Sequence, residues 1–155
     1  MRVLDVMRRY PRVATPDMDL ASAGRAMAEA RCGVLPVVGE RERVVGVLTD
    51  RDLALAVSRL DERPSQLSVR CAMSAEAWTC SAEESVRDAM ATMREHHVRR
   101  LPVVDGNGRL EGILSLDDVA AEARPERSLV PGHRLDLAVA ETMHALCEHP
   151  VPLAM

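Results

Sequence analysis

Two segments of the chain place a hydroxyl group three residues before a carboxylate: Thr49 with Asp52, and Ser115 with Asp118. Each hydroxyl ends an apolar run, and each acid falls in the first turn of an expected helix, where free backbone N–H groups and the helix dipole favour anions. A carboxylate repels phosphate but accepts hydrogen bonds from a ribose diol, so the combination suits a nucleoside phosphate. Alternatively, the two hydroxyls only cap the helices and the acids only favour the dipole.

Both pairs belong to an internal duplication. Residues 35–38 read Leu-Pro-Val-Val, and the same four residues return at 101–104, an offset of 66 residues. Copies this short bury little apolar surface alone, so we expect them to pack together as one pseudo-symmetric domain. The expected boundaries are 3–60 for the first repeat and 69–122 for the second, with 125–155 outside the duplication. Matching pairs at this offset include Met7 with Met73, Ala23 with Ala89, Met27 with Met93, Gly46 with Gly112, and Asp52 with Asp118.

Each copy predicts the order strand–helix–strand–strand–helix. Leu20, Ala23 and Met27 have the spacing of one helix face. We expect this helix to start at Thr15-Pro16, and its counterpart to start at a capping box over 81–84. The expected strands are 12–14, 34–38 and 44–48 in the first copy and 78–80, 101–104 and 110–114 in the second, and the second helices begin at Asp50 and Leu116.

Composition excludes several classes of protein. A formal net charge of −4, one Trp, one Tyr and no Phe argue against nucleic-acid binding by bulk charge or base stacking. The apolar runs are too short for a transmembrane helix, and the start of the chain lacks a secretory pattern. Four cysteines without Cys-x-x-Cys spacing fit reduced thiols in the cytoplasm. No nucleophile elbow, zinc-protease helix or phosphate loop with lysine is present, so we do not expect an enzyme.

The element order, the stretch 97–105 (His-Val-Arg-Arg-Leu-Pro-Val-Val-Asp) and the two Gly-x-x-[Ser/Thr]-x-x-Asp ends resemble a tandem cystathionine-β-synthase (CBS) domain pair over residues 3–122. The chain is similar to small stand-alone bacterial CBS-pair proteins of the hypoxia or stress type. The resemblance implies an α+β (α/β) fold of two β-α-β-β-α repeats with pseudo-two-fold symmetry. It also implies two clefts that bind an adenosyl ligand (AMP, ADP, ATP, S-adenosylmethionine or NAD), and a homodimer formed through the helices.

The resemblance also implies roles for individual residues. Asp52 and Asp118 would hold ribose hydroxyls, Thr49 and Ser115 would contact ribose or phosphate, and Arg100 would reach phosphate. Because the first copy has Val34 at the position of Arg100, we expect inequivalent clefts, the one on the Arg100 side preferring more phosphate charge. The remaining expected contacts are Thr15, Leu20, Cys32 and Gly33 around Asp118, and Ser81, Val86, Val98 and Arg99 around Asp52.

Another interpretation makes Arg99-Arg100 a surface pair bonded to Glu95 or Asp105.

Residues 125–155 form a tail outside the duplication. Leu135, Val139 and Met143 predict the apolar face of a docking helix. His144, Cys147 and His149 are of metal-ligand type but lack a standard zinc spacing, so we treat them as weak metal candidates and zinc as unlikely.

Two functions remain open. The first is a regulatory sensor that binds an adenosyl ligand between the repeats and signals to a protein partner in trans. The second is a ligand-free structural or interaction protein in which the dimer or a metal-binding tail is the functional element.

Overall fold

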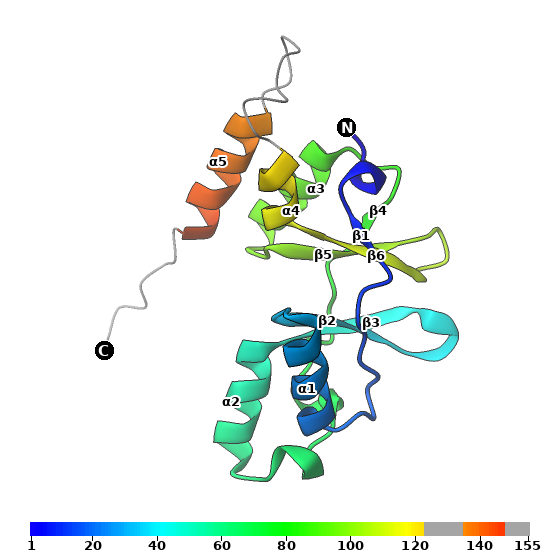
Figure 1. Cartoon of the computed structure of the whole chain (residues 1–155), viewed down its shortest axis with the longest axis vertical. Helices are drawn as coiled ribbons and strands as arrows, with labels where there is room; N and C mark the ends of the chain where they lie inside the picture. The colour runs from blue at the N-terminus through cyan, green and yellow to red at the C-terminus, as the bar shows by residue number, and fades with distance from the viewer. Residues whose placement is uncertain (123–134, 148–155) are drawn as a thin grey trace.

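The computed structural model describes residues 1–122 and 135–147, which form two packed units (Figure 1). The first unit is built around the buried side chains of Leu20, Leu35 and Leu48, and the second around those of Met90, Leu101 and Leu114. The first unit contains α1 (Leu20–Ala30), β2 (Val34–Val38), β3 (Val44–Thr49) and α2 (Asp50–Leu60). The second contains β1 (Arg8–Arg9), β4 (Cys80–Ser81), α3 (Val86–Glu95), β5 (Arg100–Val104), β6 (Leu110–Ser115), α4 (Leu116–Glu122) and α5 (Leu135–Cys147).

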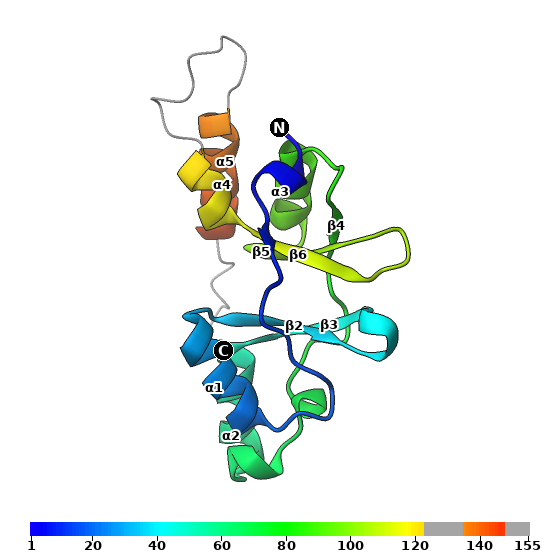
Figure 2. The same cartoon turned by 45° about the vertical axis from the view of Figure 1, so that its right-hand side comes forward.

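The sheets of the two units face each other, and the helices lie on the outer sides (Figure 2). The second unit has a four-stranded sheet in the order β1-β6-β5-β4, and the first has the β2-β3 hairpin. Single bridges at Ala14 and Ser74 pair with Val37 and Val47 of that hairpin, in the positions that β4 and β1 occupy in the second sheet. The repeats therefore share one topology, and the expected α+β fold of two CBS-like repeats is confirmed.

The segment that leads into each repeat packs on the other unit. The 3-10 turn Val3–Asp5 docks on the second unit, where the Val3 N–H donates to the Glu84 carbonyl at 2.9 Å. At the equivalent place in the first unit, the Val69 N–H donates to the Met18 carbonyl at 2.8 Å. The boundaries expected from the duplication, 3–60 and 69–122, therefore mark sequence repeats, whereas the packing units exchange their leading segments.

Two glycines permit these crossed segments to lie close to the sheets. A Cβ at Gly46 would lie 2.3 Å from the Ser74 carbonyl oxygen, and a Cβ at Gly112 would lie 2.7 Å from that of Arg8. No side chain fits at these distances, so glycine at both positions lets the incoming segment pair with the strand.

The four long strands and the second helix of each repeat lie within one or two residues of their expected positions, but the first helices begin later than expected. α1 begins at Leu20 with Asp19 as its N-cap, whereas the Thr15 carbonyl accepts the Met18 N–H in a preceding turn. The Ser22 hydroxyl and backbone N–H donate to the Asp19 carboxylate and hold its pKa below the ordinary value. The expected start at Thr15-Pro16 was wrong. Asp19 caps the helix instead, because it directly precedes Leu20, the first buried residue of the helix face.

The same correction applies to α3. It begins at Val86 with Ser85 as its N-cap, and the Ser85 hydroxyl accepts the Asp88 N–H at 3.1 Å. The expected capping box over 81–84 forms a turn, in which the Ser81 N–H donates to the Glu84 carboxylate at 3.1 Å.

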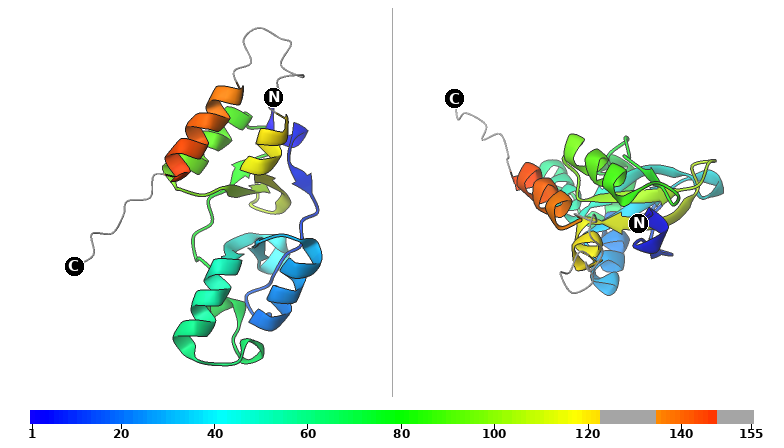
Figure 3. Two further views of the ribbon diagram at one scale, coloured as in Figure 1. Left: turned by 60° about the vertical axis from the view of Figure 1, so that its left-hand side comes forward. Right: turned by 90° about the horizontal axis from the view of Figure 1, so that it is seen from above.

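Helix α5 packs against α3 and α4 on the outer side of the second unit (Figure 3). It buries Ala138, Thr142 and Leu146, and the Arg94 guanidinium donates to the Thr142 hydroxyl at 3.0 Å. None of the helices in the described part of the chain is long and apolar enough to cross a membrane.

The apolar face expected for this helix is shifted. Val139 is partly buried against the core, but Met143 is 41 % exposed. The side chain of Leu135 lies outside the described residues. The buried face runs through positions 138, 142 and 146, which follow one another at four-residue spacing along one side of the helix.

Candidate functional site

In the described part of the chain, two clefts between the units contain the predicted acids. The first cleft, around Asp52, has a volume of about 350 Å³, and the second cleft, around Asp118, has a volume of about 380 Å³. Both volumes fall at the small end of the range for small-molecule pockets. The first cleft is lined by Val34, Val47, Thr49, Asp52, Ser74, Glu76, Trp78, His97, Val98, Arg99 and Arg100.

The second cleft repeats the first at the offset of 66 residues. Every lining residue of the first cleft except Arg99 has its counterpart in the lining of the second. Each acid also faces residues of the other repeat, so the two clefts are related by the duplication as well as by their shape. The second cleft is lined by Arg8, Arg9, Tyr10, Pro11, Arg12, Ala30, Arg31, Cys32, Val34, Arg100, Ile113, Ser115, Asp117 and Asp118.

In the first cleft, Thr49 and Asp52 form a capping box at the start of α2. The Thr49 hydroxyl donates to Asp52 Oδ2 at 2.6 Å and accepts the Asp52 N–H at 3.1 Å, and the Thr49 N–H donates to the same Oδ2 at 3.0 Å. The two bonds to the carboxylate both use Oδ2. No residue in the described ranges 1–122 and 135–147 donates to Asp52 Oδ1, so that oxygen can accept a hydrogen bond from a ligand.

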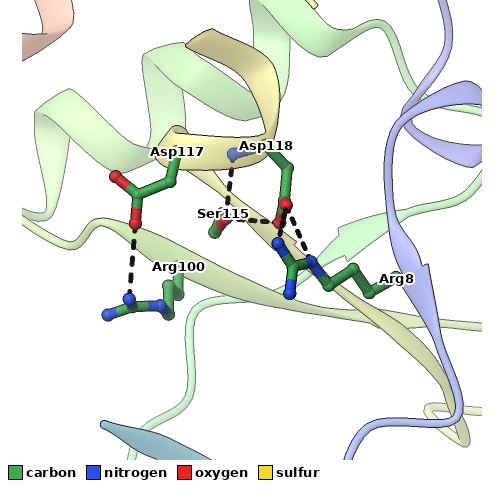
Figure 4. A network of polar contacts seen from close by, with 5 residues as sticks. All are labelled: Arg8, Arg100, Ser115, Asp117 and Asp118. Carbon is green, nitrogen blue, oxygen red and sulfur yellow. Dashed lines mark hydrogen bonds and ion pairs between the residues drawn. The ribbon is translucent and has the colours of Figure 1, made fainter. Parts of the chain in front are cut away.

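In the second cleft, Ser115 and Asp118 repeat the two hydroxyl bonds of this pair, and an arginine is added. Within residues 1–122 and 135–147, the Ser115 N–H makes no bond to Asp118 like that of Thr49 to Asp52. The Ser115 hydroxyl donates to Asp118 Oδ2 and accepts the Asp118 N–H at 3.1 Å. The Arg8 guanidinium, which comes from β1, contacts Asp118 Oδ1 through Nε at 2.7 Å and Nη2 at 2.6 Å (Figure 4). The Asp118 side chain is only 13 % exposed, whereas that of Arg8 is 74 % exposed.

Arg100 lies between the clefts and lines both of them. Its guanidinium is 3.5 Å from the Asp117 carboxylate (Figure 4). Among the described residues, neither Arg99 nor Arg100 bonds Glu95 or Asp105, so the interpretation as such a surface pair is wrong. Glu95 approaches His96 at 4.0 Å, and Asp105 accepts the backbone N–H groups of Arg109 and Asn107, which hold its pKa below the ordinary value.

The clefts differ in charge, but not in the way expected from Arg100. Since Arg100 and Val34 each line both clefts, that pair cannot distinguish them. The second cleft has five arginines against two aspartates, a formal charge of +3, whereas the first has two arginines against Asp52 and Glu76, a formal charge of zero with His97 neutral. The more basic cleft is therefore the one around Asp118.

Several residues that the resemblance implied lie where expected. Val98 and Arg99 line the first cleft with Asp52 and Thr49, and Cys32 lines the second with Asp118 and Ser115. Val98, Arg99 and Cys32 all come from the turn before the first long strand of their repeat. Arg31 and His97 in these turns adopt left-handed backbone, with φ of 50° and 52°, which turns the chain from helix to strand beside the cleft.

Five of the implied contacts do not line either cleft. Leu20 and Val86 are 0 % and 1 % exposed in the hydrophobic cores, because they are the first buried residues of α1 and α3. Gly33 lies beside the Asp50 carboxylate instead. Thr15 and Ser81 lie at the far end of the sheets: Ser81 pairs in parallel with Val104, so only the residues that precede β4 run back toward the clefts.

Those preceding residues include the aromatic side chains that the sequence analysis undervalued. Trp78 lines the first cleft and stacks on His96 with ring centroids 3.4 Å apart, and Tyr10 lines the second cleft and is 92 % exposed. They are the only Trp and Tyr of a chain without Phe. Tyr10 lies four residues before Ala14, and Trp78 lies two residues before Cys80, and Ala14 and Cys80 are the matching strand positions of the two repeats. This location just before a strand was the signal in the sequence for a place in the clefts.

The tail candidates for metal binding are not brought together in the described structure. His144 is exposed on α5, and the side chain of Cys147 and all of His149 lie outside the described residues. Within the part that the structure describes, no three His, Cys, Asp or Glu side chains are arranged to hold a metal ion.

Comparison with known proteins places these features in a family context. A sequence profile of the CBS domain matches residues 3–59 and 69–124. The CBS domain-containing protein YhcV of Bacillus subtilis is 35 % identical over 126 residues, which cover 81 % of this chain and 88 % of YhcV. Overall, the chain spans 59 %, 88 % and 64 % of the lengths of three curated relatives.

Two solved structures have the same fold. CBSX2 of Arabidopsis thaliana in complex with AMP superposes with a TM-score of 0.69 at 29 % identity, covering 79 % of this chain and 95 % of CBSX2. Hypoxic Response Protein I with two coordinated zinc ions superposes with a TM-score of 0.72 at 28 % identity, covering 80 % of this chain and all (100 %) of that protein.

Proposed function

The chain belongs to the CBS domain family, and on that premise we propose that it is a non-catalytic regulatory sensor that binds an adenosine-containing ligand in the first and second clefts. The ligand class comprises AMP, ADP, ATP, S-adenosylmethionine and NAD. The AMP complex of the related CBSX2 supports this class.

The recurrence of one constellation in both clefts is the observation that carries this proposal. Asp52 and Asp118 each stand in a cleft with a hydroxyl neighbour and side chains of the other repeat. Helix capping alone does not require this location. The Ser85–Asp88 pair at the start of α3 makes the same hydroxyl–carboxylate and hydroxyl–N–H bonds but lines neither cleft.

The location also supports a mechanism for signalling. Since each cleft is lined by both units, a bound ligand restrains one unit relative to the other. Ligand binding would then shift the population of arrangements of the two units and change the outer surface of the protein. A homodimer and a protein partner in trans would respond to that change.

The test compares the cleft acids with a matched capping acid. We expect calorimetry with AMP, ATP and S-adenosylmethionine to show binding to the wild type, loss of one site in Asp52→Asn and of the other in Asp118→Asn, and no change in Asp88→Asn. A ligand at about 100 times its Kd should stabilise by about 2.7 kcal/mol and raise the Tm by roughly 5–10 °C.

The single Trp separates the clefts. Trp78 lines only the first cleft, so its fluorescence should respond to ligand in Asp118→Asn but not in Asp52→Asn. If no adenosyl ligand binds, or if Asp88→Asn weakens binding as much as the cleft variants do, the sensor proposal is wrong. The ligand-free interaction protein is then favoured, and a Tm shift with zinc that is lost in Cys147→Ala would identify its metal-bound form.

A further inference from the structure

The two clefts differ at one structurally matched position. Arg8 and Ser74 are separated by 66 residues, and each makes the antiparallel pair with the last strand of the opposite sequence repeat, with Ile113 and Val47 respectively. The Ser74 hydroxyl donates to the Val47 carbonyl at 3.2 Å and makes no bond to Asp52. Arg8, which lies beside β6, instead contacts Asp118 in the first turn of α4.

Arg8 occupies the oxygen that a ribose would need. In the first cleft Asp52 Oδ1 has no donor among the described residues, but in the second cleft both nitrogens of Arg8 contact Asp118 Oδ1 (Figure 4). A ligand without negative charge must therefore break this ion pair and leave the guanidinium with only solvent as its partner. A ligand that carries phosphate offers Arg8 a new partner, because guanidinium binds phosphate through two parallel hydrogen bonds.

The exchange is favourable on electrostatic grounds. The Arg8 side chain is 74 % exposed, so its pair with Asp118 is weaker than a buried pair and the guanidinium has solvent through which to turn. Arg9, Arg12, Arg31 and Arg100 line the same cleft and add positive charge around the phosphate.

We propose that the second cleft is selective for polyphosphate nucleotides, and that Arg8 sets this selectivity by leaving Asp118 for the phosphates when a ribose takes its place. The first cleft, with Ser74 and a formal charge of zero, accepts nucleosides and nucleotides with little regard to phosphate number. The inference rests on the proposed function for its ribose contact, whereas its anion contact stands on Arg8 alone.

The experiment isolates one cleft at a time. Calorimetry with adenosine, AMP, ATP and inorganic tripolyphosphate is carried out on Asp52→Asn, which leaves the second cleft, and on Asp118→Asn, which leaves the first. We expect ATP to bind the second cleft at least about 100-fold more tightly than adenosine, and the first cleft less than about 10-fold more tightly. Charge-assisted hydrogen bonds of this kind support such ratios.

Reciprocal substitutions assign the difference to one residue. In the Asp52→Asn background, Arg8→Ser should weaken ATP by about 10- to 100-fold and strengthen adenosine. Arg9→Ser removes the same charge from the same cleft without touching Asp118, so it should weaken ATP less and leave adenosine unchanged. In the Asp118→Asn background, Ser74→Arg should weaken adenosine, as reported by Trp78 fluorescence.

The outcomes separate this inference from the proposed function. If nucleotides bind but Arg8→Ser leaves the ratio of ATP to adenosine affinity unchanged, the role of Arg8 is wrong and the sensor stands. If no adenosyl ligand binds either cleft, the sensor proposal fails. Tripolyphosphate then decides the anion contact: equal binding to wild type and Arg8→Ser overturns it, and loss of binding in Arg8→Ser supports it.

Discussion

The two units share one backbone plan but cover their outer helices differently. In the second unit α5 lies over α3 and α4 and buries Ala138 and Leu146, which are 5 % and 3 % exposed. In the first unit α2 has no such cover within the described residues, and Leu55 and Leu60 are 42 % and 48 % exposed. The sheet faces that build the clefts therefore correspond between the units, whereas the outer helical faces differ.

The largest expected effect tests whether the units fold together. Leu35 and Leu101 occupy the same position in the two repeats, and both are 0 % exposed. Leu35→Ala and Leu101→Ala should each lower the free energy of unfolding by about 2–5 kcal/mol, because each leaves a cavity. Since each unit includes a segment from the other repeat, we expect one cooperative transition in thermal and denaturant unfolding. Two resolved transitions would show that the units are independent.

The next effect concerns the cover of the second unit. Leu146→Ala should lower the free energy of unfolding by about 1.5–3 kcal/mol, since it exposes a buried contact of α5 with the core. Leu137→Ala on the same helix, at a side chain 38 % exposed, should change it by no more than about 0.5 kcal/mol. Equal effects in urea unfolding would contradict the docking of α5.

The crossed segments provide a third comparison. Gly46→Ala should destabilise by about 1–3 kcal/mol, because the new Cβ would meet the Ser74 carbonyl oxygen at 2.3 Å. Gly112→Ala should cost less, since its nearest atom, the Arg8 carbonyl oxygen, would be 2.7 Å away. Gly106→Ala meets nothing within 4 Å and serves as the control. The ranking is measured by denaturant unfolding, and an unaffected Gly46→Ala would refute the close approach.

The smallest effect is a difference in pH dependence between the units. Burial, with Glu84 adding to it, raises the pKa of the Cys80 thiol to about 12, whereas the matched position in the first unit is Ala14. In the unfolded chain the thiol ionises near its ordinary pKa of about 8.5. The stability that Cys80 contributes is therefore present below this pH and is lost as pH rises toward 12.

Between pH 9 and 10 we expect wild type to lose about 1 kcal/mol more stability than Cys80→Ala, which copies the first repeat. The measurement is denaturant unfolding of both proteins at each pH. Parallel pH profiles would show that the thiol is not buried in this way.

Much of the secondary structure could be predicted from residue patterns. The matched apolar runs at 35–38 and 101–104 predict paired inner strands, and β2 and β5 lie there. Helix starts were less accurate at α1 and α3, because several cap residues compete and the buried face selects among them. The exchange of leading segments, with Val3 in the core of the second unit, had no local signal since it depends on pairing between distant strands.

The same division holds for the clefts. The hydroxyl–acid pairs and their recurrence are properties of the sequence, since local helix-capping chemistry and the duplication place them at equivalent strand ends. Only the tertiary structure decided which residues complete each cleft. It brought Arg8 to Asp118 and left Asp52 Oδ1 open, and it placed Trp78 and Tyr10 beside the acids of the other repeat. These contacts join residues far apart in the chain through crossed strand pairing. Spacing along the sequence shows that Trp78 and Tyr10 precede the strand positions, but not which acid they lie near.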